Sequence, residues 1–88
     1  MYRIKYHKQV VKFLQSTQKN VAKKIIESFN LLKQDPYENI KKLDIKKLES
    51  YENFYRLRVG KFRVIFLIDN DEILIEVIQA KSRGDIYK

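Results

Sequence analysis

The sequence contains no cysteine, a single histidine and only two glycines, and each scarcity removes a class of site. Without cysteine there is no disulfide and no thiolate metal site, and this suits a reducing compartment. His7 alone cannot supply the clustered ligands of a zinc or two-metal centre. Gly60 and Gly84 are too far apart to form a phosphate-binding glycine loop. We therefore expect no metal and no cofactor.

Long apolar runs are also missing. No stretch approaches the roughly 18 residues of a membrane-spanning helix, and the charged first residues do not read as a signal peptide. We therefore expect a cytoplasmic protein with no membrane partner. The 88 residues fit one domain, 1–88.

Positive charge is abundant: 19 lysines and arginines oppose 11 acidic residues, for a net charge of +8. Such a field favours a polyanionic partner, either nucleic acid or an acidic protein. The charge alone leaves open a second reading, in which the lysine-rich surface only keeps the protein soluble.

Hydrophobic periodicity in the first part of the chain predicts a strand followed by two helices. Residues 2–7 alternate between apolar and charged side chains, as in a half-buried strand. Residues 10–14, including Val11, then carry a helical stripe, and Val21–Leu32 carry a second one that ends before Pro36. Thr17 is the expected N-cap of the second helix. The two helices should form an antiparallel hairpin.

The second part of the chain predicts a three-stranded antiparallel meander. Residues 37–53 are polar and lysine-rich, and we expect an ordered surface connection there. Strands follow over 54–59, 62–68 and 73–80. Gly60-Lys61 reads as a two-residue type II′ turn. With the N-terminal strand joined to this meander, the fold class is α+β.

The Gly60-Lys61 turn fixes the register of the first hairpin. It places Val59 opposite Phe62 and Arg58 opposite Arg63, and alternation then separates two faces. One face should pack on the helices, and it carries Tyr55, Leu57, Val59, Val64 and Phe66. The other face carries Arg56, Arg58 and Arg63, and we call it the arginine face.

The arginine face breaks a local rule, because like charges on directly opposite residues destabilise a sheet. Such conflicts concentrate at functional sites, and the planar guanidinium suits phosphate. A turn at Asn70-Asp71 would place Ile68 opposite Ile73 and Val64 opposite Val77. That register brings Lys81, Arg83 and Tyr87 toward the arginines and Glu76 toward Arg56. A solvated face whose arginines pair with carboxylates remains the alternative.

The residues favour catalysis by lysine and arginine side chains, because no two acidic residues have a spacing that indicates a catalytic pair. Cleavage of RNA needs an aligned 2′-hydroxyl and stabilised charge on the phosphoryl oxygens, which positioning and electrostatics supply in large part. Tyrosines such as Tyr55 and Tyr87 offer stacking surfaces for bases.

Two segments carry a family resemblance. Residues 55–66 read Tyr-Arg-Leu-Arg-Val-Gly-Lys-Phe-Arg-Val-Ile-Phe, and residues 82–87 read Ser-Arg-Gly-Asp-Ile-Tyr. Together with Lys47-Leu48 and the order of predicted elements, they resemble the RelE/ParE superfamily of toxins from type II toxin–antitoxin systems. The likeness is greatest to the compact RelE-like toxins of archaeal type. It implies one RelE-like toxin domain with the RelE-like microbial RNase fold.

The resemblance implies a ribosome-dependent, metal-independent mRNA endoribonuclease (an mRNA interferase) that inhibits translation. The implied partners are the ribosome, mRNA and a RelB-like antitoxin, the last in a heterotetrameric complex. By position in the family motifs, Arg63 stabilises the transition state and Tyr87 stacks on the nucleotide. The implied catalytic residues are Arg56, Arg58, Arg63, Lys81, Arg83 and Tyr87. To these we add Lys47, Lys61 and Tyr55 as candidate RNA-binding residues.

The general base stays open. Arg56 and Arg58 stand where the best-studied members carry lysines, and arginine is always protonated. A lysine (Lys81, Lys61 or Lys47) or Tyr87 takes the proton, or catalysis is mainly electrostatic. Two other functions also stay open: a ParE-like inhibitor of DNA gyrase without nuclease activity, and a basic RNA-binding module without catalysis.

Overall fold

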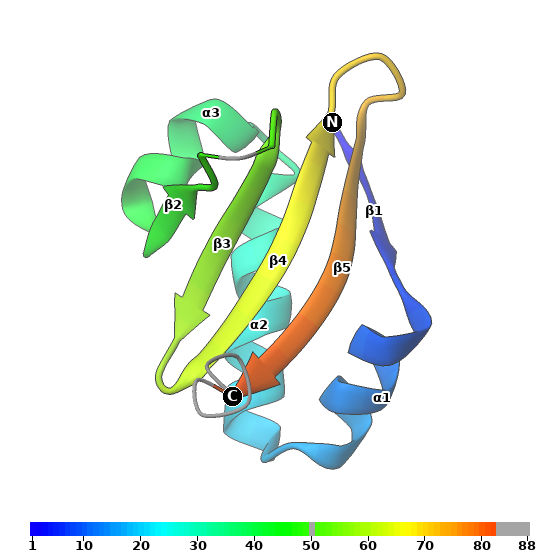
Figure 1. Ribbon diagram of the computed structural model, residues 1–88, viewed down its shortest axis with the longest axis vertical. Coiled ribbons are helices and arrows are strands. Elements are labelled where there is room, and N and C mark those ends of the chain that lie inside the picture. The colour runs from blue at the N-terminus through cyan, green and yellow to red at the C-terminus, as the bar shows by residue number, and fades with distance from the viewer. Residues whose placement is uncertain (50, 83–88) are drawn as a thin grey trace.

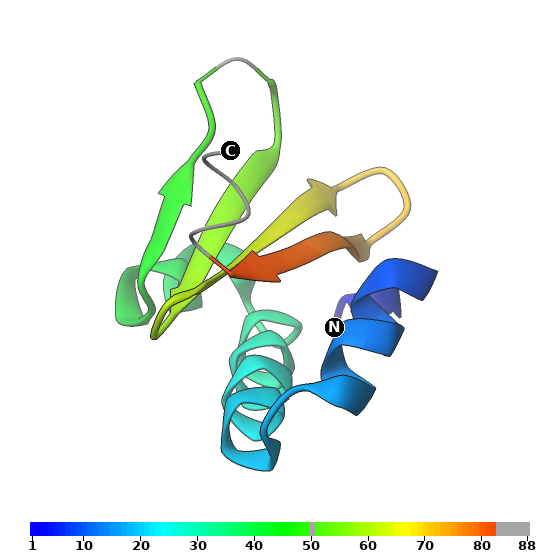
Figure 2. The same ribbon diagram turned by 60° about the horizontal axis from the view of Figure 1, so that its bottom comes forward.

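The computed structural model describes residues 1–49 and 51–82, and it has an α+β architecture. Three helices and one 3₁₀ turn accompany a five-stranded sheet in the order β1-β5-β4-β3-β2. Helices α1 and α2 cover one face of this sheet, and no helix among the described residues covers the other, which we call the open face (Figures 1 and 2). The elements in chain order are β1 (Arg3–Tyr6), α1 (Lys8–Ser16), α2 (Lys19–Leu32), α3 (Pro36–Asn39), η1 (Ile40–Lys42), β2 (Ile45–Lys47), β3 (Phe54–Val59), β4 (Phe62–Asp69) and β5 (Leu74–Ser82).

The helical hairpin forms as predicted, with α2 running back against the direction of α1 (Figure 1). In the predicted stripe of α2, Ile25, Phe29 and Leu32 have no exposed surface, and Val21 is half-buried. Two details differ. Val11 is 39 % exposed, because its neighbour Val10 is the residue that faces the sheet. Thr17 is not the N-cap of α2: its N–H donates to the Phe13 carbonyl and so ends α1.

The segment expected as a surface connection, residues 37–53, contains regular structure. Pro36 opens α3 with the Asp35 carboxylate accepting from the Glu38 N–H, an arrangement that proline at the first helical position favours. Further along, β2 pairs antiparallel with β3. The sheet therefore has five strands and not the four expected. A strand of three residues is too short to show a clear period of two.

The register of β3 against β4 is the predicted one at every pair, including Arg58 opposite Arg63 and Val59 opposite Phe62. Gly60 has φ +59, and Lys61 is not among the residues with positive φ. This combination matches a type II′ turn, in which glycine takes the first central position. Because the loop contains only these two residues, the pairing of β3 with β4 cannot shift, and the turn fixes which side chains share a face.

The register of β4 against β5 differs from the predicted one. Ile68 lies opposite Ile75 and not Ile73, because the loop is two residues longer and Ile73 adopts φ +51 within it. A β-bulge follows between Ile65 and Phe66, opposite an extra residue in β5. The extra residue reverses the alternation of β5 beyond the bulge.

Aromatic rings join the two layers. Phe29 of α2 meets Phe66 of β4 edge to face at 5.2 Å between ring centroids, and Tyr6 of β1 meets Phe29 at 6.0 Å. These rings and the aliphatic side chains around them form one core beneath the sheet. Within residues 1–49 and 51–82, no helix is long and apolar enough to cross a membrane.

Candidate functional site

The arginine face lies on the open side of the sheet, and the structure adds a lysine to it. Arg58 of β3 is paired with Arg63 of β4, and Arg63 is paired in turn with Lys81 of β5. Directly opposite residues on adjacent strands have Cβ atoms roughly 5 Å apart. The result is a row of three cations across three neighbouring strands, and we call it the cation row.

The β-bulge is what brings Lys81 into this row. Before the bulge, Val77 points into the core, and unbroken alternation would send Lys81 to the helix side as well. Because β5 carries one extra residue, Ala80 is buried and Lys81 shares the face of Arg63. The sequence predicted that Lys81 approaches the arginines, but not this direct pairing.

A carboxylate bridges two of the arginines. Arg58 Nε donates to Asp44 Oδ2 at 2.8 Å, and Arg56 Nη2 lies 3.6 Å from Asp44 Oδ1. The Arg56 side chain is only 16 % exposed, whereas Arg58 and Asp44 are close to half exposed. The sequence did not single out Asp44, because β2 and the turn before it were not expected.

The predicted partner of Arg56 was Glu76, and this prediction is wrong. Glu76 lies opposite Leu67 on one side and beside Lys5 of β1 on the other. Its carboxylate is 3.2 Å from His7 Nε2, at the start of α1. The longer β4–β5 loop moves Glu76 away from the position that the predicted register gave it.

Strand β2 separates the two lysines at the sheet edge. Lys46 is paired with Arg56 and so lies on the arginine face, whereas Lys47 is paired with Tyr55 on the helix side. The structure therefore does not bring the predicted RNA-binding residue Lys47 to the arginines. Leu43 and Ile45 do alternate with Asp44 and Lys46, but over four residues this alternation is too short to predict a strand on its own.

Tyr55, predicted as a stacking surface for a base, belongs to the core instead. It is 9 % exposed, and its ring stacks on Phe66 with centroids 5.6 Å apart and planes 21° apart. Burial raises the pKa of its hydroxyl above the ordinary value. The alternation that puts arginines on one face puts this ring on the other.

Three further predicted residues complete the placement. Lys61 lies in the β3–β4 turn, with its ammonium 5.5 Å from the centroid of the Phe62 ring, a cation–π contact. Arg83 and Tyr87 lie outside the described residues. In the part of the chain that the structure describes, no group of three His, Cys, Asp or Glu side chains could hold a metal ion.

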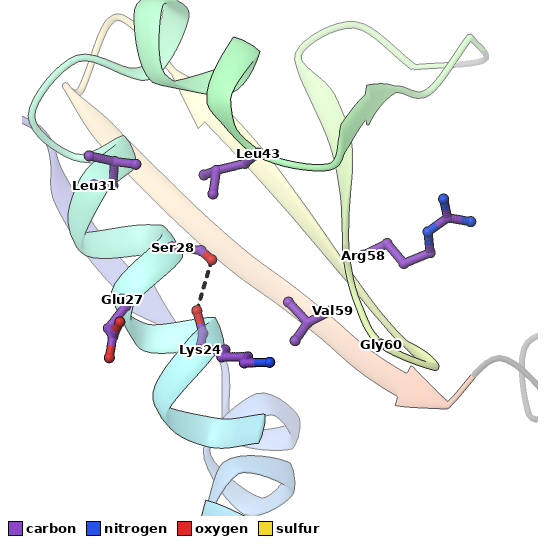
Figure 3. A pocket seen from close by; sticks show the side chains of 8 residues that line it. All are labelled: Lys24, Glu27, Ser28, Leu31, Leu43, Arg58, Val59 and Gly60. Carbon is purple, nitrogen blue, oxygen red and sulfur yellow. Dashed lines mark hydrogen bonds between the residues drawn. The ribbon is translucent and has the colours of Figure 1, made fainter. Parts of the chain in front are cut away.

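A groove of about 560 Å³ lies on the opposite side of β3, between α2 and the end of that strand. Leu31, Leu43 and Val59 supply apolar walls, and Lys24 lies at the rim with Ser28 Oγ bonded to its carbonyl at 2.8 Å. Figure 3 shows the Arg58 guanidinium pointing away from this groove. The groove and the arginine face thus lie on either side of β3, and they meet at Arg58, whose side chain also lines the groove.

Comparison with known proteins gives a consistent family. Residues 3–87 match the family described as the ParE toxin of the type II toxin–antitoxin system, parDE. The RelE1 protein of Methanocaldococcus jannaschii is 33 % identical over 87 residues, which cover 99 % of this chain and 96 % of that protein.

Solved structures agree with the sequence comparisons. A chain of the archaeal RelE–RelB complex from Pyrococcus horikoshii OT3 superposes with a TM-score of 0.80 and 38 % identity, over 94 % of this chain and 96 % of that one. A chain of the RelB–RelE antitoxin–toxin complex from Methanococcus jannaschii gives 0.79 and 30 %, over 96 % and 95 %. The isolated RelE toxin of E. coli shares the fold, with a TM-score of 0.78 at 13 % identity over 93 % and 84 %.

Proposed function

This chain belongs to the RelE/ParE superfamily of toxins from type II toxin–antitoxin systems, and from that premise we propose that it is a ribosome-dependent mRNA endoribonuclease. The observation that carries the proposal is the cation row, in which Arg58, Arg63 and Lys81 stand side by side on an open face. A row of that kind follows the spacing of neighbouring strands and suits a phosphodiester backbone laid across them.

The proposed chemistry is attack of the 2′-hydroxyl on the adjacent phosphorus. As the bond from the 2′-oxygen to phosphorus forms, the bond to the 5′-oxygen of the next nucleotide breaks. The 2′-hydroxyl gives up its proton, the leaving 5′-oxygen takes one up, and a 2′,3′-cyclic phosphate remains, so the step consumes no water. Charge builds on the non-bridging oxygens as the fifth bond forms. Fixed cations that face those oxygens stabilise this charge without reorganising during the reaction.

Arg63 is the residue we place at the non-bridging oxygens, because it is the central member of the cation row. Lys81 is the candidate for proton transfer among the three lysines named from the sequence, since Lys47 lies on the other face and the Lys61 ammonium lies over the Phe62 ring. Arg56 and Arg58 extend the positive field. Arg83 and Tyr87 keep the roles that the family resemblance gives them, as proposals.

We further propose an antitoxin as the protein partner, in keeping with the RelE–RelB complexes that this chain resembles. The groove beside α2 has apolar walls and a charged rim, which suits the apolar face of an amphipathic helix. An acidic antitoxin would also match the net charge of +8.

The test is primer extension on mRNA bound to purified ribosomes, with and without the protein. New 5′ ends within the codon in the decoding site are expected only when both ribosome and protein are present. Intact mRNA under these conditions would rule the nuclease out.

A second candidate is a toxin that inhibits DNA gyrase without cleaving RNA, and the family match to ParE favours it. Supercoiling of relaxed plasmid by gyrase separates the two candidates. The nuclease proposal expects supercoiling to proceed unchanged at concentrations of the protein that cleave ribosome-bound mRNA completely.

A further inference from the structure

Asp44 is the one described carboxylate that the structure places on the arginines. A surface that must bind a polyanion gains nothing in affinity from a negative charge beside its arginines, since that charge repels the incoming phosphate. We propose that Asp44 is an internal counter-ion that holds Arg56 and Arg58 in place. A phosphate must therefore compete with Asp44 for either of these two arginines. This inference rests on the proposed function, since it assumes an RNA strand on this face.

Two connections fix Asp44 to the same residue. The Arg58 N–H donates to the Asp44 carbonyl at 2.9 Å, and Arg58 Nε donates to Asp44 Oδ2 at 2.8 Å. The main-chain bond continues the β2–β3 ladder by one residue, so the carboxylate is held beside the guanidinium by the sheet itself. An intramolecular partner of this kind acts at a high effective concentration, which a phosphate from solution must exceed.

Arg56 is held more by burial than by contact. Its Nη2 lies 3.6 Å from Asp44 Oδ1, and its side chain is 16 % exposed. Its Nε is buried and has no hydrogen-bond partner among the residues described. A partly buried ion pair is screened less by salt than an exposed one. Arg56 is therefore the member of the face least free to swing toward a phosphate.

Lys81 contrasts with both arginines. Within residues 1–49 and 51–82 it forms no ion pair, and it borders a hollow lined by Phe13 and Phe62. The Asp44 carboxylate lies on the β2 side of Arg58. The strand positions of Arg58 on β3 and Arg63 on β4 therefore separate it from Lys81 on β5. Asp44 thus neutralises charge on β3, and it does not reach Lys81 on β5.

The test is the salt dependence with which the full chain binds a short single-stranded oligoribonucleotide, compared between the unmodified protein and Asp44→Asn. The asparagine keeps the main-chain bond and can still accept from Arg58, so the fold is retained, which circular dichroism verifies. If the substitution frees one arginine for a phosphate, the slope of log K against log salt steepens by about 0.7. At 50 mM salt the same contact tightens binding roughly eightfold.

Two control variants separate this role from a general gain in charge. Asp71→Asn removes an equal charge from the exposed β4–β5 loop, at the other end of the sheet, and should leave the slope unchanged. Asp44→Glu keeps the carboxylate and should keep a slope close to that of the unmodified protein.

Three outcomes would overturn the inference: an unchanged slope for Asp44→Asn, weaker binding than the unmodified protein, or no measurable binding by either. An unchanged slope with tighter binding would mean that RNA already displaces the carboxylate from the arginines. Each of these results leaves the ribosome cleavage assay free to support or reject the nuclease on its own.

Discussion

At the scale of single residues, Arg63 stands out because a cation lies opposite it on each neighbouring strand. It lies between Arg58 and Lys81 on the neighbouring strands, so each neighbour in register repels it. Replacing it should therefore relieve repulsion in the free protein and remove stabilisation from the transition state. Stability and activity are expected to respond in opposite directions or independently, which distinguishes a functional arginine from a structural one.

We predict that Arg63→Ala lowers the rate of cleavage of ribosome-bound mRNA by about 10²–10³-fold, the usual cost of removing one preorganised donor. The thermal midpoint should change by less than about 4 °C, as for a residue outside the core. Single-turnover primer extension and thermal unfolding followed by circular dichroism measure the two effects.

Arg3→Ala is the matched control, because it removes one positive charge from the exposed end of β1, far from the cation row. It should cleave at the rate of the unmodified protein. If Arg63→Ala instead unfolds the domain, the arginine face is structural and its assigned role is wrong.

Tyr6 shows a different residue-scale effect, set by burial. Its hydroxyl oxygen is buried without a hydrogen-bond partner among the described residues, and burial raises the pKa of Tyr6 to about 12. The folded state therefore resists ionisation, whereas the unfolded chain releases this proton near pH 10. The contribution to stability is complete below pH 10 and is lost as the pH rises toward 12.

We predict that Tyr6→Phe is as stable as the unmodified protein at pH 8 or more stable, because it removes an unsatisfied polar group. Between pH 10 and 12 the unmodified protein should lose stability relative to the variant by roughly 1–2 kcal/mol, less than a fully buried group would. Urea unfolding of both proteins at pH 8 and 11 measures the difference. A difference that does not change with pH would show that the hydroxyl is solvated.

At the scale of elements, the hairpin of β3 and β4 was predictable in full and its neighbours were not. Gly60 dictates a two-residue turn, and the turn alone sets every pair on the two strands. The β4–β5 loop carries no such signal, because its length depends on Ile73 adopting a left-handed conformation that isoleucine disfavours. The bulge in β5 was invisible for a similar reason, since nothing in the sequence near Ile78 marks an extra residue.

The candidate site shows the same division. Arg58 and Arg63 could be paired from the sequence, because both belong to the tight hairpin. Asp44 could not be placed, because its position depends on β2, whose pairing with β3 spans a long loop. Residues held by local turns were predictable, and residues brought in by non-local pairing required the structure.

A side chain of α1 completes the hydrogen bonding of β5 where its pairing with β1 ends. β1 stops pairing at Val77, and from there Gln9 of α1 takes the place of a strand. Its Nε2 donates to the Ala80 carbonyl and its Oε1 accepts from the Ala80 N–H, both at 2.9 Å. This side chain holds the main chain next to Lys81, and so it supports the cation row from the edge of the sheet.

We predict that Gln9→Ala leaves the buried Ala80 peptide without partners and destabilises the end of β5 by roughly 1–3 kcal/mol. Amide hydrogen exchange at Ala80 should quicken by about tenfold or more, with little change at Val64 in the middle of β4. Gln9→Glu, which can accept but not donate when ionised, should fall between the two. Unchanged exchange at Ala80 would show that Gln9 does not secure the strand.

At the scale of the whole molecule, the net charge of +8 favours the binding of a polyanionic partner. The ion pairs between exposed side chains on the helices, such as Lys23 with Glu27 at 3.9 Å, contribute little. Helices α1 and α2 lie on one face of the sheet (Figure 2), and the cation row lies on the other. The helix side therefore secures the fold, and the proposed function assigns RNA to the opposite side.

The central claim is that this open face cleaves mRNA through the 2′-hydroxyl on the ribosome. The most direct measurement compares two mRNAs on purified ribosomes, one of them carrying a single 2′-deoxynucleotide on the 5′ side of the cleaved phosphate. The account predicts a new 5′ end in the all-ribose mRNA and none at that position in the substituted mRNA. Cleavage of both mRNAs at that phosphate, or of neither, would contradict it.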